Sequence, residues 1–125
     1  MGLKEKVAQT ILSNTVRPKR RKFGVEIENF YYKRGTVERI PVNDENYFSA
    51  SKLLESVNSA VNANSHYSYS LEPGGQLEWA SGPSTSLWEI KNQFDENILI
   101  QEKLCKNNGI DIGYFSVEPV SMPFD

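Results

Sequence analysis

The stretch "SLEPGGQLEW", residues 70–79, constrains the fold of this chain most strongly. Its centre, Pro-Gly-Gly at 73–75, contains the residues that tight turns require, because proline presets φ and glycine tolerates positive φ. Polar and apolar residues alternate after the turn, which is typical of a half-buried strand. The sequence therefore predicts an antiparallel hairpin with strands at 66–72 and 76–80.

Two further segments have the apolar spacing of short amphipathic helices. Residues 2–13 carry an apolar stripe made of Leu3, Val7, Ala8, Ile11 and Leu12, and Asn14 and Pro18 follow as stop signals. A second helix is predicted to begin near Ser49 or Ser51. Its apolar positions recur with helical period at Leu53, Leu54, Val57 and Val61.

The third predicted helix has the clearest boundaries. Ser86 and Glu89 form the pattern of a capping box, in which each side chain bonds to the other's backbone N–H. Gly109 is a natural C-terminal stop, and Lys103 and Lys106 lie where the helix dipole favours cations. We expect its apolar face to contain Leu87, Ile90, Phe94, Ile98 and Cys105.

Three more segments are predicted to be strands. Residues 23–32, "FGVEIENFYY", would direct Val25, Ile27 and Asn29 to one face and Gly24, Glu26, Glu28 and Phe30 to the other. A turn then leads to "TVERIPV" at 36–42, and a last strand is predicted at 110–119. Helices and strands mixed with a hairpin predict an α+β fold with an antiparallel sheet and flanking helices.

The length and composition are those of one small domain. The chain has 125 residues, and no run of about 18 apolar residues that could cross a membrane. Its one cysteine, Cys105, cannot form an internal disulfide and fits a reducing, cytoplasmic setting. We expect a helix and basic connector at 1–21, followed by the main domain at 22–125.

The charge distribution is uneven. Residues 1–22 hold seven basic side chains and one acidic, whereas the remainder holds seven basic and fifteen acidic. The basic run "RPKRRK" at 17–22 permits a nucleic-acid interface, but we favour a solvated connector, because the acidic remainder would repel phosphates. We therefore predict neither a nucleic-acid nor a membrane partner.

Carboxylates occur with strand spacing in two separate segments. Glu26 and Glu28 leave one face of the first strand, and Gln76 and Glu78 leave one face of the hairpin's second strand, with Glu72 before the turn. If the two strands are neighbours, the carboxylates gather in one place and favour a cation such as Mg²⁺ together with a nucleotide. If they are not neighbours, each pair is a solvated strand face, and the pattern alone leaves both alternatives open.

Two segments together resemble a known enzyme family. "FGVEIENF" followed by "YSLEPGGQLEWASGPSTSL" resembles the glutamate–cysteine ligases of the plant and proteobacterial type. That family carries an E-x-E strand near its start and later a stretch close to S-L-E-P-G-G-Q-x-E-x-S-G-A-P. The match at 70–83 is nearly continuous, and the resemblance extends over residues 22–125.

The resemblance implies an ATP-dependent ligase that joins the γ-carboxylate of glutamate to cysteine through an acyl phosphate, the first step of glutathione synthesis. It implies a curved antiparallel sheet related to the catalytic sheet of glutamine synthetase. By motif position, Glu26, Glu28 and Glu78 would bind Mg²⁺. Glu72 and Gln76 would line the nucleotide or substrate side of the pocket, with ATP, glutamate and cysteine as substrates.

Enzymes of this family are several times longer than this chain. We therefore expect either an N-terminal fragment of a ligase that is inactive alone, or one part of a split or assembled enzyme with the missing remainder as its partner. Two alternatives stay open: a related carboxylate–amine ligase with another amine substrate, and a binding module without catalysis.

The single histidine and the cysteine have structural interpretations. His66, in the polar run "NANSHYSYS", is predicted to lie on the surface before the hairpin rather than to act as an acid, base or ligand. Cys105 is predicted to be a packed thiol, because no histidine that could activate it lies nearby in the sequence.

Overall fold

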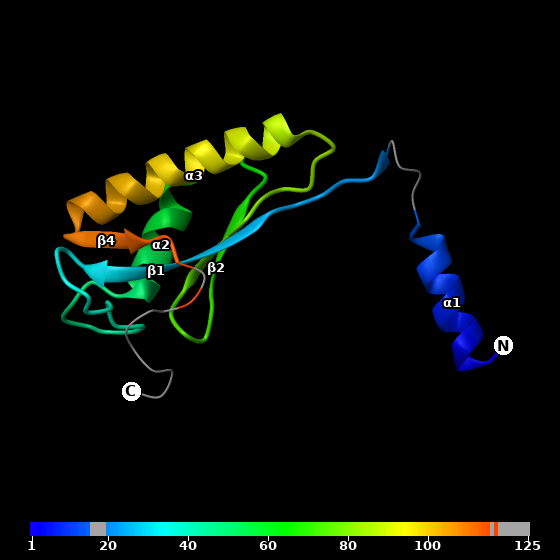
Figure 1. Cartoon of the computed structure of the whole chain (residues 1–125), viewed down its shortest axis with the longest axis horizontal. Coiled ribbons are helices and arrows are strands. Elements are labelled where there is room, and N and C mark those ends of the chain that lie inside the picture. Colours follow the sequence, from blue (N-terminus) through cyan, green and yellow to red (C-terminus); the bar gives the residue numbers. More distant parts are fainter. Residues whose placement is uncertain (16–19, 116, 118–125) are drawn as a thin grey trace.

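The computed structural model describes residues 1–15, 20–115 and 117 and has the predicted α+β class (Figure 1). The parts of the predicted basic connector at 17–19 and of the predicted last strand at 116 and 118–119, together with Pro18, lie outside these residues. The elements follow in the order α1 (Leu3–Ser13), β1 (Glu26–Lys33), α2 (Ala50–Ala60), β2 (Ser68–Leu71), β3 (Leu77–Ala80), α3 (Leu87–Asn107) and β4 (Ile110–Gly113).

The strands form one open antiparallel sheet with the order β2-β3-β1-β4. The predicted hairpin is confirmed, since β2 and β3 pair across the Pro-Gly-Gly turn. The amide of Glu72 donates to the carbonyl of Gln76 at 2.9 Å, and Gly75 has a φ of 82°. A three-residue loop that ends on a residue of positive φ is a common hairpin connection, so the sequence of the turn explains its geometry.

Strand β1 connects the two halves of the sheet. Its first half pairs with β3, and its second half pairs with β4 on the other side. Ile27, Asn29 and Tyr31 face the helices, whereas Glu26 and Glu28 leave the opposite face. The predicted face assignment is therefore confirmed in this strand.

Helices α2 and α3 cover one face of the sheet and enclose the core (Figure 1). Leu77 and Trp79 of β3 are fully buried there, as predicted, and Leu53 and Val57 of α2 pack against them. Helix α2 begins after Ser49, whose hydroxyl accepts a hydrogen bond from the amide of Lys52 at 3.3 Å. The helix layer leaves the opposite face of the sheet to other segments and to solvent.

The predicted buried face of α3 is confirmed in part, since Ile90 and Cys105 are buried and Phe94 packs against the core. Leu87, expected on that face, is 71% exposed, whereas Asn97 and Gln101 are fully buried. Gln101 donates to Asn97 Oδ1 at 2.6 Å and accepts a hydrogen bond from the hydroxyl of Tyr31, and Tyr69 donates to Asn97 Oδ1 at 2.8 Å. Tyrosine hydroxyls from the sheet bond to the side-chain oxygens of both amides, whereas the buried Asn97 Nδ2 has no hydrogen-bond partner in the described part of the chain. Polar and apolar side chains therefore share the buried face of α3.

The capping box predicted for α3 is also wrong, although the helix does begin after Ser86. The Ser86 side chain makes no cap hydrogen bond. Glu89 instead accepts a hydrogen bond from the hydroxyl of Ser84, which itself accepts one from the amide of Ser86 at 2.9 Å. Ser84 therefore accepts from the Ser86 amide, a bond that the capping-box pattern assigns to the Glu89 side chain.

The strand predicted at 36–42 does not form. This segment makes only an isolated bridge to β1, between Tyr32 and Arg39. Pro41 cannot donate to a sheet ladder, and its carbonyl accepts from the amide of Ala50, while the carbonyl of Val42 accepts from Ser51. The segment is therefore held against the start of α2 rather than within the sheet.

Helix α1 has the predicted bounds to within one residue, but none of its residues is buried. Its apolar stripe includes Leu3 and Ile11, which are 78% and 62% exposed. No helix among the described residues is both long enough and apolar enough to cross a membrane.

Candidate functional site

The sheet register brings the acidic side chains of two strands onto one face. Glu28 of β1 lies directly opposite Glu78 of β3. Glu26, two residues before Glu28 on β1, lies opposite Ala80. Directly opposed residues share a face, and their Cβ atoms are about 4.5–5.5 Å apart. Of the two alternatives that the sequence left open, the structure selects neighbouring strands, with Glu26, Glu28 and Glu78 together on the face opposite the helices.

The hydroxyl of a residue on β2 contacts one carboxylate of the Glu28–Glu78 pair. Ser70 of β2 lies opposite Glu78 on its other side and donates a hydrogen bond to Glu78 Oε1 at 3.0 Å. Our sequence reasoning missed Ser70. The signal was present, because counting outward from a three-residue turn pairs 72 with 76 and therefore 70 with 78.

The turn places Glu72 and Gln76 at one end of the hairpin. Both are half-buried, and a Cβ on Gly74 would lie 2.3 Å from Gln76 Oε1, so the Gln76 side chain folds back over the turn. Gln76 Oε1 is buried and has no hydrogen-bond partner. A buried amide oxygen without a partner is costly, which makes it a candidate to accept a hydrogen bond from a ligand.

Arg39 holds the turn in place, and no sequence signal identified it. Its guanidinium lies 4.7 Å from the ring centroid of Phe30 and donates to the carbonyl of Gly74. A Cβ on Gly75 would approach Val42 Cγ2 to 2.9 Å, so the turn is packed closely against the 39–42 segment. The segment 36–42, which was predicted to be a strand, therefore contacts and positions the turn between Glu72 and Gln76.

Glu26, Glu28 and Glu78 form the acidic face of the sheet, and Arg39, which lies over the ring of Phe30, is not ion-paired with them. None of the ion pairs recorded among the described residues involves Glu26, Glu28 or Glu78. Like charges directly across a sheet are destabilising, and a bound cation would remove that cost. No three His, Cys, Asp or Glu side chains within the described parts of the chain form a ready-made metal cluster, so the carboxylates supply at most part of a coordination shell.

The remaining candidate residues lie where the sequence predicted. His66 is exposed and precedes β2, and Cys105 is buried on α3. Burial raises the pKa of the Cys105 thiol to about 12, and the charge of Asp111 acts in the same direction. A thiol with so high a pKa is a poor nucleophile, which agrees with a packing role.

Comparison with family models, with curated proteins and with solved structures finds no match to this chain. The geometry of the acidic face and the motifs that form it therefore carry the proposed function.

Proposed function

We propose that the acidic face of the sheet binds a magnesium nucleotide in an ATP-dependent carboxylate–amine ligase, with glutamate as the acid and cysteine as the amine. The observation that carries the proposal is the register that sets Glu28 directly opposite Glu78 on the face away from the helices. The motif resemblance of residues 70–83 supplies the reaction, and the curved sheet of glutamine synthetase type is part of the same proposal.

The residue types fit this cation. Mg²⁺ is commonly bound by one or two carboxylates together with substrate phosphates, so a complete protein cluster is not required. Glu28 and Glu78 would provide the two carboxylates, with Glu26 beside them, and the Ser70 hydroxyl would orient Glu78. The ion supplies neutralisation of the phosphate charge during phosphoryl transfer.

In this proposal, the side chains beside the hairpin turn contact the nucleotide and the carboxylate of the glutamate substrate. Glu72 and Gln76 border the acidic face at the end of the hairpin, where the unpartnered Gln76 Oε1 is available as an acceptor. In the proposed reaction, the γ-phosphoryl group passes from ATP to the glutamate carboxylate and ADP leaves. The amine of cysteine then attacks the acyl carbon, phosphate leaves, and the amine nitrogen loses a proton.

Thermal unfolding with and without Mg²⁺ and ATP tests the proposal. Without ligand, Glu78→Gln relieves the repulsion with Glu28, and we expect it to stabilise the chain by about 0.2–1 kcal/mol. At ligand concentrations one hundredfold above Kd, wild type gains about 2.7 kcal/mol, whereas Glu78→Gln gains much less. The order of the two melting temperatures is therefore reversed by the ligand.

Glu55→Gln serves as the matched control, because Glu55 is an exposed carboxylate on α2. It should respond to Mg²⁺ and ATP as wild type does. A Glu78→Gln variant that keeps the full response to Mg²⁺ and ATP would show that the acidic face is not the nucleotide site.

A further inference from the structure

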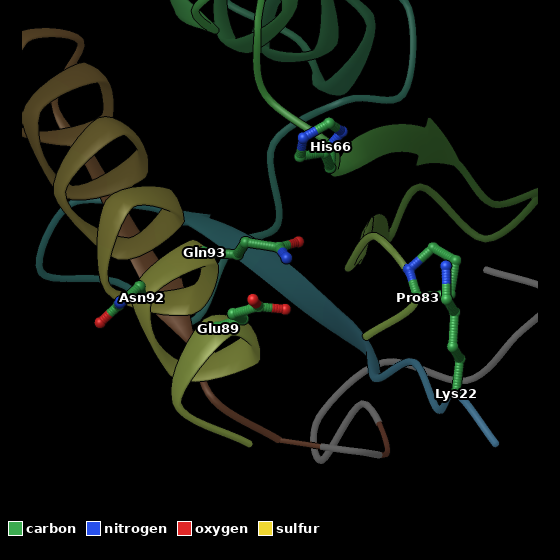
Figure 2. A pocket seen from close by; sticks show the side chains of 6 residues that line it. All are labelled: Lys22, His66, Pro83, Glu89, Asn92 and Gln93. Carbon is green, nitrogen blue, oxygen red and sulfur yellow. The ribbon is translucent and has the colours of Figure 1, made fainter. Parts of the chain in front are cut away.

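A hollow of about 630 Å³ lies beside the first two turns of α3 and is not part of the acidic face. It is bordered by Lys22, His66, Pro83, Glu89, Asn92 and Gln93. Its volume is within the range of small-molecule sites, about 300–1,000 Å³. Figure 2 shows Glu89 and Gln93 reaching from α3 toward Pro83 and Lys22, with His66 above them.

The backbone around the hollow is tightly fixed. The amide of Gly82 donates to Gln93 Oε1 at 2.7 Å, and a Cβ on Gly82 would lie 2.6 Å from the carbonyl oxygen of His66. Phe23 and Ser84 exchange backbone hydrogen bonds of 2.9 and 3.0 Å, which anchor the residue next to Lys22. The hollow is therefore a built feature of the fold and not a gap between loose loops.

The charges that border the hollow are opposite but do not pair with each other. Lys22 and Glu89 are not within ion-pair distance, since none of the recorded ion pairs among the described residues joins them. Glu89 receives one hydrogen bond, from Ser84, on Oε2. Gln93 uses Oε1 for Gly82, which leaves its amide nitrogen as a donor, and the His66 ring makes no hydrogen bond within residues 1–15, 20–115 and 117.

From this arrangement we infer a binding site for a small zwitterion of the amino-acid class, a molecule with one free carboxylate and one free ammonium group. The ligand carboxylate accepts from Lys22, His66 and the Gln93 amide, and the ligand ammonium group donates to Glu89. A ligand with only one of these charges leaves the opposite wall of the hollow unsatisfied. The affinity is in the millimolar range, because the bordering side chains are largely exposed.

His66 is the only histidine in the chain, so the Hε1 proton of its ring gives the single histidine Hε1 NMR signal, which reports on the hollow. We expect L-glutamine, used as the probe, to shift this signal and the Gln93 side-chain amide signal saturably. N-acetyl-L-glutamine lacks the ammonium group and the α-amide of glutamine lacks the carboxylate, so both should shift these signals much less. Equal responses to all three compounds, or no response to glutamine, would overturn the inference.

Charge variants locate the site. Lys22→Gln and Glu89→Gln should each weaken glutamine binding about threefold, in proportion to the loss of one exposed charge pair. Lys103→Gln and Glu55→Gln, at exposed positions elsewhere on α3 and α2, should leave binding unchanged. Glu78→Gln should also leave glutamine binding unchanged, which distinguishes this site from the acidic face. Loss of binding in Glu78→Gln but not in Glu89→Gln would contradict the assignment.

Discussion

Replacing Gln101 by leucine tests whether the buried amides hold α3 on the sheet. Gln101 is fully buried and bonds both to the hydroxyl of Tyr31 and to Asn97 Oδ1. Leucine is of similar size, so the substitution removes the recorded acceptor of the Tyr31 hydroxyl while little volume changes. A buried polar group without a partner costs about 1–3 kcal/mol, which corresponds to roughly 3–5 °C in Tm per kcal/mol for a chain of this length.

The complementary change, Tyr31→Phe, leaves Gln101 Oε1 without its donor and should cost a similar amount. Removing both groups together leaves neither orphaned, so the double variant should be about 1–2 kcal/mol more stable than the sum of the single changes predicts. Urea unfolding, followed by the fluorescence of the buried Trp79, measures all three free energies of unfolding.

Lys103→Leu is the control, because Lys103 is exposed on the same helix and should change stability by less than about 0.5 kcal/mol. Additive losses in the double variant would refute the reasoning, since they would mean that the Tyr31–Gln101 hydrogen bond does not couple the two residues.

Three further outcomes follow from the structure. Gly75→Ala should destabilise the chain by more than Gly35→Ala. Both glycines have positive φ, but only at Gly75 would the added Cβ lie close to another atom, Val42 Cγ2. Chemical denaturation measures both losses of stability, and equal losses would contradict the packing argument. Cys105 should react with a thiol reagent at pH 8 far more slowly in the native chain than in urea, because its folded pKa is about 12, and equal rates would show that the thiol is accessible. Stability should fall as pH rises from 9 toward 12, because the unfolded chain releases the Cys105 proton above its ordinary pKa of 9.0 while the folded chain retains it. Denaturation across this pH range should show a shallower decline for Cys105→Ala than for wild type, and an unchanged slope would argue against the raised pKa. Burial also raises the pKa of Tyr31 and Tyr69, which adds to the same alkaline loss.

The sequence alone determined the local geometry of the acidic face. A Pro-Gly-Gly turn with three loop residues fixes the pairing of β2 with β3, and therefore places Ser70 opposite Glu78. The alternation of side chains in a strand puts Glu26 and Glu28 on one face. These features depend on neighbours in the chain, and they can be predicted because a period of two and a tight turn leave few alternatives.

Tertiary packing decided which strand lies beside β3 and which helix positions are buried. The β1–β3 pairing joins residues about fifty positions apart, and no local pattern distinguishes it from a pairing between β1 and 36–42. The burial of Asn97 and Gln101 depends on hydroxyl groups supplied by Tyr31 and Tyr69 of the sheet. The apolar period correctly placed Ile90, Phe94 and Cys105 on the buried face of α3, but it gives no signal for a buried amide, whose position depends on bonding partners from other elements.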